Sequence, residues 1–148
     1  MREALFSALV SRDAVGGARV ADLYAGTGAL GLEALSRGAA TVTFVENSPA
    51  ALDALRANIA ALGAGGEVTA VRADVTAWLR RAPAGAFDLV LADPPYDAPE
   101  LPRLPERALR LLAPGGTLAV EHDTRHSFDD AAWSRRYGRT MVSLWVVE

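Results

Sequence analysis

The sequence predicts an α/β fold built on a mostly parallel, seven-stranded sheet with helices on both faces. Short apolar runs, several of them rich in β-branched residues, alternate with segments whose apolar residues have helical spacing. Five strand–helix units in series are typical of a parallel sheet. The last two β-prone runs, 133–137 and 140–147, are joined by Gly138 and Arg139, which indicates an antiparallel hairpin at one edge.

In the first half of the chain, turn and cap residues mark the ends of each element. The opening helix has four apolar side chains on one face, Leu5, Phe6, Leu9 and Val10. The run 19–23 predicts a strand that enters a glycine-rich turn, and the helix after it ends near Gly38. The run 41–45 (TVTFV) predicts a buried strand. Ser48 is the N-cap of the next helix, which starts with a proline and ends at Gly63.

The second half of the chain continues the pattern. Three further parallel strands are predicted at 67–72, 87–92 and 117–121. Asp74 follows the first of them and caps a helix that carries Trp78 and Leu79. A proline-rich entry starts the helix predicted over 101–112, and residues 114–116 (Pro-Gly-Gly) are expected to end it.

Length and composition limit what the chain can be. Its 148 residues fit one domain, 1–148, of ordinary size. The absence of Cys excludes disulfides, thiolate metal sites and thiol catalysis, and we expect a cytoplasmic protein. Uncharged stretches are shorter than the roughly 20 apolar residues of a membrane-spanning helix. A net charge of −3 without a basic block argues against binding nucleic acid mainly by neutralising phosphates.

Polar residues that could do chemistry follow the predicted parallel strands. In open α/β sheets, ligands bind beyond the carboxyl ends of the strands, where the strand order reverses. The first strand leads into residues 22–31 (DLYAGTGALG), and the second is followed by Glu46 and Asn47. Asp74 follows the third strand, and residues 93–96 (DPPY) follow the fourth. Four such positions in series predict one ligand site at this edge of the sheet.

The glycines of the first turn predict a close approach of the backbone to a ligand. Gly26, Gly28 and Gly31 form a G-x-G-x-x-G pattern, and Glu46 lies 20 residues after Gly26. This combination is typical of a dinucleotide site, because the acid can accept hydrogen bonds from both ribose hydroxyls. It suits NAD or any other adenosine cofactor, and the alternative is a tight strand-to-helix turn without a ligand.

Asp22 distinguishes between these cofactors. NAD would place an anionic pyrophosphate at this turn, and a nearby carboxylate would repel it. S-adenosylmethionine carries a sulfonium and an ammonium group instead, and a carboxylate at Asp22 favours both. Asp22 could also simply accept hydrogen bonds from loop amides. Asp74 could accept a hydrogen bond from the adenine amino group, act as a plain helix N-cap, or do both.

Residues 93–96 indicate chemistry on an amino group. An exocyclic purine amine is a poor nucleophile, because its lone pair is conjugated with the ring. The Asp93 carboxylate and the Pro94 carbonyl could each accept one N–H and so favour a tetrahedral nitrogen. Pro94 and Pro95 have a fixed φ and no N–H group, which stiffens the loop. Tyr96 offers a flat face on which a flipped-out base can stack. The alternative is a proline-stiffened loop without chemistry.

With these motifs, the chain resembles class I S-adenosylmethionine-dependent methyltransferases that carry a D-P-P-Y motif and methylate amino groups. It further resembles the bacterial 16S ribosomal RNA guanine-N2 methyltransferases, the D-type small-subunit enzymes, over essentially its whole length. The segments that carry the resemblance are 2–6 (REALF), 22–28 (DLYAGTG), 32–38 (LEALSRG), 44–46 (FVE), 91–96 (LADPPY) and 137–140 (YGRT). The resemblance implies a Rossmann-like class I methyltransferase fold and methyl transfer to guanine N2 of 16S rRNA within an assembling small-subunit particle.

The resemblance also implies a role for each residue of the site. The residues that would hold the methionine part of S-adenosylmethionine are Asp22, Tyr24, Gly26 and Gly28. Glu46 would hold the ribose, Asn47 would flank the adenine, and Asp74 would bond the adenine edge. The residues that would hold the target guanine are Asp93, Pro94, Pro95 and Tyr96. The product would be S-adenosylhomocysteine. No metal site is expected, and His122 and His126 are assigned to capping or to solvent.

Other functions stay open at this point. The family usually has a basic N-terminal extension with a β-hairpin before its REALF helix; this chain begins at that helix, so the extension is expected to be absent. The same amine chemistry would serve adenine N6 or a protein glutamine amide. An NAD-dependent oxidoreductase and a non-catalytic cofactor-binding module are the remaining alternatives.

Overall fold

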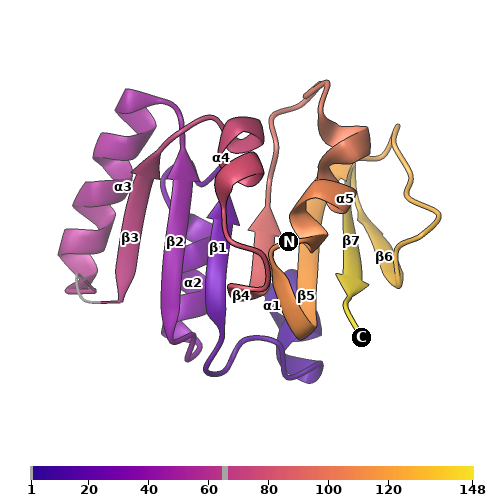
Figure 1. The fold of residues 1–148 in the computed structure, drawn as a ribbon, viewed down its shortest axis with the longest axis horizontal. Coiled ribbons are helices and arrows are strands. Elements are labelled where there is room, and N and C mark those ends of the chain that lie inside the picture. The colour runs from indigo at the N-terminus through magenta and orange to yellow at the C-terminus, as the bar shows by residue number, and fades with distance from the viewer. Residues whose placement is uncertain (1, 65–66) are drawn as a thin grey trace.

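The computed structural model, which describes residues 2–64 and 67–148, has one seven-stranded sheet with the strand order β3-β2-β1-β4-β5-β7-β6 (Figure 1). The strands are β1 (Arg19–Leu23), β2 (Thr41–Glu46), β3 (Val68–Arg72), β4 (Phe87–Ala92), β5 (Leu112–Asp123), β6 (Trp133–Tyr137) and β7 (Thr140–Val146). Strands β1 to β5 are parallel, β7 pairs antiparallel with β5, and β6 pairs antiparallel with β7. The mostly parallel sheet with a C-terminal antiparallel hairpin is confirmed.

Helices cover both faces of the sheet. They are α1 (Arg2–Ser11), α2 (Ala29–Ser36), α3 (Pro49–Leu62), α4 (Val75–Arg81), the 3-10 turn η1 (Leu101–Arg103) and α5 (Leu104–Leu109). Buried side chains of α1, α2 and α3 share one core with the sheet, and those of α4 and α5 share a second core on the opposite face. In Figure 1, α4 and α5 lie in front of the sheet, and α1 and α2 lie behind it. None of the helices in the described residues is long and apolar enough to cross a bilayer.

The predicted helix caps are present. The Ser48 hydroxyl accepts a hydrogen bond from the Ala51 amide (3.3 Å), and Asp74 accepts one from the Ala77 amide (3.0 Å). Gly63 ends α3 in the left-handed conformation, with a φ of 67°. In α1, three of the four expected apolar side chains are buried, but Val10 is 50% exposed because it lies next to Leu9 at the rim of the apolar stripe.

The C-terminal half contains one error of prediction. The helix expected over 101–112 ends as α5 at Leu109, and β5 begins at Leu112 rather than at residue 117. The Pro-Gly-Gly segment at 114–116 therefore lies within the strand, where it forms a bulge: Phe87 pairs with Leu112, but Leu89 pairs with Thr117. The Gly115 amide donates to the Val147 carbonyl (2.8 Å) and the Val147 amide donates to the Gly116 carbonyl (2.9 Å), so the bulge is held against the C-terminal end of the chain. Turn-forming residues here shape a bulge instead of a loop.

The strand order reverses between β1 and β4, which places the carboxyl ends of these two strands side by side. Leu23 pairs with Ala92, so the residues that follow β1 and β4 leave the sheet at the same level. A crevice at such a reversal is the usual ligand site of an open α/β sheet. The residues predicted to form the site come from the loops at this edge.

Candidate active site

A cavity of about 420 Å³ lies at the carboxyl edge of the sheet. Its lining residues come from the ends of β1, β2, β3 and β4 and are Tyr24, Glu46, Asn47, Ser48, Asp74, Val75, Asp93, Pro95 and Glu100. Six of the predicted site residues are among them, namely Tyr24, Glu46, Asn47, Asp74, Asp93 and Pro95. The strand-end argument therefore brings together residues that are up to 71 positions apart in the chain (from Tyr24 to Pro95).

The other five predicted residues do not line this cavity. Pro94 and Tyr96 line a smaller neighbouring pocket of about 190 Å³, to which Arg139 of the hairpin also contributes. Gly26 and Gly28 belong to the turn between β1 and α2, and Asp22 is buried within β1. The two pockets share Asp93 and Pro95, so the D-P-P-Y loop separates them.

Glu46 fixes the shape of the cavity wall. One carboxylate oxygen accepts a hydrogen bond from the Gly26 amide (2.7 Å), and the other accepts one from the Ser48 amide (2.8 Å). Each oxygen retains a second acceptor site. Glu46 can therefore hold the glycine turn and still accept hydrogen bonds from a ligand in the cavity.

Packing explains two of the three glycines. A Cβ on Gly28 would lie 2.3 Å from the Leu55 side chain, and one on Gly31 would lie 2.4 Å from the Phe44 ring. At Gly26 a Cβ would meet no atom within 4 Å, but the φ of 59° favours glycine. Gly31 thus brings α2 close to β2, Gly28 lets the start of α2 approach α3, and Gly26 serves the turn itself.

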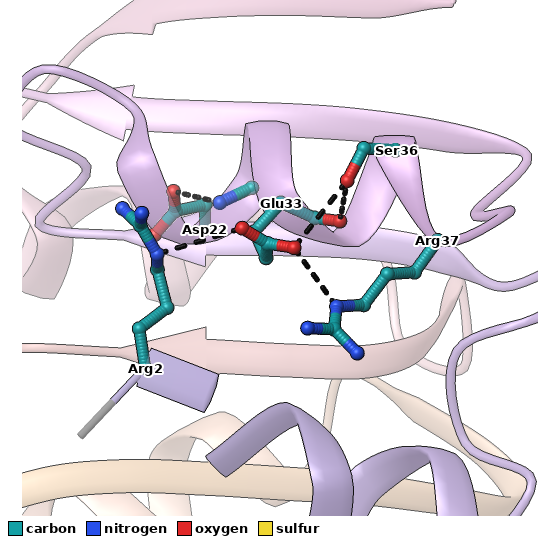
Figure 2. A network of polar contacts seen from close by, with 6 residues as sticks. Arg2, Asp22, Glu33, Ser36 and Arg37 are labelled. Carbon is teal, nitrogen blue, oxygen red and sulfur yellow. Dashed lines mark hydrogen bonds and ion pairs between the residues drawn. The ribbon is translucent and has the colours of Figure 1, made fainter. Parts of the chain in front are cut away.

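Asp22 is buried and acts as a hydrogen-bond acceptor for the helix that follows the turn. Its carboxylate accepts a hydrogen bond from the Gly31 amide (2.9 Å), as the loop-amide alternative predicts. Figure 2 shows this bond beside the ion pairs that Glu33 of α2 makes with Arg2 (3.5 Å) and Arg37 (2.8 Å). Burial, only partly offset by that hydrogen bond, and the charges of nearby carboxylates together raise the pKa of Asp22 to about 8.

Asp93 and Glu121 form a pair of neighbouring carboxyl groups. Asp93 is exposed at the cavity, yet partial loss of water raises its pKa, and a hydrogen bond with Glu121 lowers it in part. Burial and the charge of Asp93 raise the pKa of Glu121 to about 7. The sequence reasoning missed Glu121, although it too stands at the carboxyl end of a predicted strand, the signal used for the other acids.

Glu100 is a second residue that the sequence reasoning missed. Its carboxylate accepts a hydrogen bond from the Tyr24 hydroxyl (3.0 Å) across the cavity wall. Burial and this hydrogen bond raise the pKa of Tyr24. Tyr24 itself has a left-handed backbone, with a φ of 58°. Glu100 lies at the N-cap position of η1 without a side-chain capping bond, and no predicted strand end marks it.

Tyr96 presents its ring at the surface of the smaller pocket, with 69% of the residue exposed. The guanidinium of Arg125 lies 4.6 Å from the ring centroid. Arg125 also pairs with Asp97 (2.8 Å) and Asp123 (3.3 Å). The β5–β6 connection therefore supports the D-P-P-Y loop from one side.

His122 lies in the protein interior, where its ring is held by polar contacts. It is buried, and its ring nitrogens contact the Ser143 hydroxyl (2.8 Å) and the Asp123 carbonyl (3.0 Å). Burial lowers its pKa. Within residues 2–64 and 67–148, no group of three or more His, Asp or Glu residues has an arrangement that could hold a metal ion.

A family model described as "Conserved hypothetical protein 95" matches residues 1–146. The chain belongs to this family. Two curated relatives of the chain carry methyltransferase names. The Escherichia coli K12 "Ribosomal RNA small subunit methyltransferase D" is 36% identical over 121 residues, which is 82% of this chain and 57% of that protein. The Mycolicibacterium smegmatis "Release factor glutamine methyltransferase" is 41% identical over 140 residues, 76% of this chain and 47% of that protein.

Solved structures agree with the family assignment. A conserved hypothetical protein from Streptococcus pyogenes has a TM-score of 0.86 at 28% identity, covering 100% of this chain and 96% of that one. An S-adenosylmethionine-dependent methyltransferase from Mesorhizobium loti has a TM-score of 0.64 at 28% identity, covering 81% of this chain and 53% of that one. The resemblance inferred from the motifs and the Rossmann-like class I methyltransferase fold are confirmed.

The chain spans about half the length of the two curated relatives named above. That residues 1–148 form one catalytic domain stays a prediction. The ligand roles assigned to individual site residues also stay predictions.

Proposed function

We propose that the chain transfers a methyl group from S-adenosylmethionine to the N2 amine of a guanine in 16S rRNA. The observation that carries the proposal is the Asp93–Pro95 segment standing at the edge of a carboxylate-lined cavity. An amine held by this loop would lie next to a cationic cofactor held in the cavity. Methyltransferase names among the relatives support the reaction class.

The charges around the cavity fit a cationic cofactor. Asp22, Glu46, Asp93 and Glu121 are close enough that the last three raise the pKa of Asp22. Within the described part of the chain, none of the five salt bridges involves any of the four. A sulfonium and an ammonium group would relieve this repulsion, whereas the pyrophosphate of NAD would add to it. S-adenosylmethionine supplies a methyl group already bound to a positively charged sulfur.

The lining residues divide between the parts of such a cofactor. Glu46 accepts hydrogen bonds from the ribose hydroxyls with its remaining acceptor sites. Asn47 and Asp74, which line the cavity, would flank the adenine. Asp22, buried in β1, would add negative charge near the methionine part. Tyr24, held by Glu100, forms the wall between the two ends.

The D-P-P-Y loop prepares the amine. The carboxylate of Asp93 and the carbonyl of Pro94 each accept one N–H, which directs the nitrogen lone pair away from the base plane. Tyr96 stacks on the base at the smaller pocket. S-adenosylmethionine would supply the methyl group and would retain the electron pair of the broken C–S bond as the N–C bond forms, and Asp93 would accept the proton that the nitrogen loses. Catalysis is therefore mainly positioning.

The RNA substrate is supported by the relative named for the ribosomal small subunit. We further propose that the substrate is an assembling particle, because a chain with a charge of −3 cannot gather much affinity from free phosphates. The release factor relative supports a second candidate, methylation of a protein glutamine amide, which needs the same two acceptors. Adenine N6 requires no different machinery.

The test is an Asp93→Ala variant, with Asp53→Ala on the exposed side of α3 as the matched control. Tritiated methyl transfer into small-subunit particles should fall by roughly 100-fold or more, since an acceptor at the reacting group is lost. Binding of S-adenosylhomocysteine, measured by calorimetry, should stay within about threefold. The control should match the wild type in both assays.

The same assay separates the substrates. Particles, DNA and release factor are offered in parallel, and the labelled product is digested to identify the methylated base or amino acid. Label in the protein fraction alone would replace guanine by glutamine as the target. Full activity of Asp93→Ala on any substrate would refute the mechanism.

A further inference from the structure

Glu121 lies directly beside Asp93 at the end of the sheet. Ala92, the last residue of β4, pairs with Val120 of β5, so Asp93, which directly follows β4, stands level with Glu121 of β5. Side chains alternate along a strand, so both point to the face of Leu91 and Ala119, whose core includes α1, α2 and α3. Two carboxyl groups thus lie side by side at the carboxyl edge of the sheet.

The two groups interact through a proton. Asp93 and Glu121 lie close enough to influence each other's pKa, and two carboxyl groups can share a hydrogen bond only when one of them is protonated. Burial and the charge of Asp93 raise the pKa of Glu121 to about 7; burial raises the pKa of Asp93 as well, but there the interaction with Glu121 acts in the opposite direction and lowers it in part. The proton therefore belongs to Glu121, and the negative charge belongs to Asp93.

Within the described residues, none of the salt bridges gives Glu121 a partner other than Asp93. On β1, Asp22 is a third carboxyl group, and on β7 the residue paired with Glu121 is Val142. In α1, Glu3 is exposed and Arg2 pairs with Glu33 of α2 (3.5 Å). The next residue of β5, His122, points to the other face of the sheet.

We propose that Glu121 is a positioning residue for Asp93: in its protonated form it donates a hydrogen bond to one carboxylate oxygen of Asp93 and leaves the other oxygen for the substrate amine. The inference rests on the proposed amine methylation and adds a residue to it. Glu121 does not touch the substrate. It fixes the rotation of the Asp93 carboxylate and keeps that group ionised beside a second acid.

Ionisation of Glu121 removes this support. Above neutral pH, two adjacent carboxylates repel each other, and Asp93 loses the donor that orients it. The turnover number should therefore decline as the pH rises through about 7, even though the amine substrate itself does not titrate there. A glutamine at the same place donates an N–H at every pH.

The experiment compares Glu121→Gln, Glu121→Ala and the exposed control Glu106→Gln, measuring kcat and KM from pH 6 to pH 9. Glu121→Gln should keep kcat within about threefold at pH 6.5 and lose the decline above pH 7. Glu121→Ala should lower kcat by roughly 10- to 100-fold at every pH with little change in the KM for S-adenosylmethionine. Asp22 is present in the wild type and in every variant, so its own titration affects all of the compared pH profiles alike.

An unchanged pH profile in Glu121→Gln, or a wild-type kcat in Glu121→Ala, would overturn the proposal. A carbon-13 NMR titration of the free protein gives a readout without turnover. The Glu121 carboxyl should titrate near pH 7 in the wild type and at lower pH in Asp93→Asn, and an ordinary midpoint in both would also overturn it. Absence of methyl transfer by the wild type would instead refute the proposed function, and the NMR result would still decide the pairing.

Discussion

At the scale of single residues, the acids of the site each have a second task. Asp22, Glu46 and Asp74 all accept hydrogen bonds from backbone amides of the turns and helices that follow their strands. The position of each acid at a strand end was predictable, because local hydrophobic runs fix where strands stop. The partners of each acid were not, since they depend on how the loops fold back.

The raised pKa of Asp22 predicts that cofactor binding releases protons. In the free protein Asp22 is mostly protonated at pH 7, because its pKa is about 8. A cationic ligand favours the ionised form, so its pKa falls on binding and a proton leaves. Calorimetry with S-adenosylmethionine at pH 7 should give heats that differ between buffers of different ionisation enthalpy.

An Asp22→Asn variant should reduce both the proton release and the affinity for S-adenosylmethionine, while Asp53→Asn should change neither. The amide can still accept from Gly31, so the turn is kept. Equal heats in all buffers for the wild type would contradict the role of Asp22.

At the scale of elements, the carboxylate of Asp74 both caps α4 and lines the cavity. Asp74 accepts from the Ala77 amide and also lines the cavity. Asp74→Ala should lower the free energy of unfolding by about 1 kcal/mol, since an N-cap is lost. Asp74→Ser restores the cap and should recover that stability, but it removes the carboxylate.

Cofactor affinity separates the two tasks of Asp74. If the carboxylate accepts a hydrogen bond from adenine, both variants should bind S-adenosylhomocysteine roughly tenfold more weakly, as calorimetry would show. Wild-type affinity in Asp74→Ser would leave Asp74 as a cap alone. Chemical denaturation supplies the stability of each variant.

Elements with local signals were predicted closely, and the exception has a physical cause. Ser48 and Gly63 bound α3 as expected, because cap preferences act within a few residues. Leu112 joins β5 because it pairs with Phe87, 25 residues earlier in the chain. No local pattern contains that pairing, so the helix expected over 101–112 was too long.

At the scale of the whole molecule, the strand order itself was beyond the local sequence patterns. The alternation of elements predicts a parallel sheet, but not that β1 lies between β2 and β4. That arrangement decides the site, since it brings Tyr24 and Asp93 to one cavity. For the same reason, only the register between β4 and β5 shows that Glu121 stands beside Asp93.

The cavity predicts how the entire fold responds to ligands. A ligand at 100 times its Kd adds about 2.7 kcal/mol to the free energy of unfolding. For a chain of 148 residues this corresponds to a rise in Tm of roughly 5–11 °C. S-adenosylhomocysteine should produce such a rise in a thermal melt, and NAD should produce none. A shift with NAD alone would favour an oxidoreductase.

The bulge at 114–116 isolates the site from changes at the other end of its own strand. Hydrogen bonds to Val147 hold the bulge, and the pairs from Leu89–Thr117 onward restart the ladder on the site side. A residue gained or lost inside the bulge is absorbed there, so Glu121 keeps its level with Asp93. A residue gained after Thr117 would turn Glu121 to the opposite face. The base of β5 can thus gain or lose residues, while the four residues from Thr117 to Val120 that lead to Glu121 must keep their number.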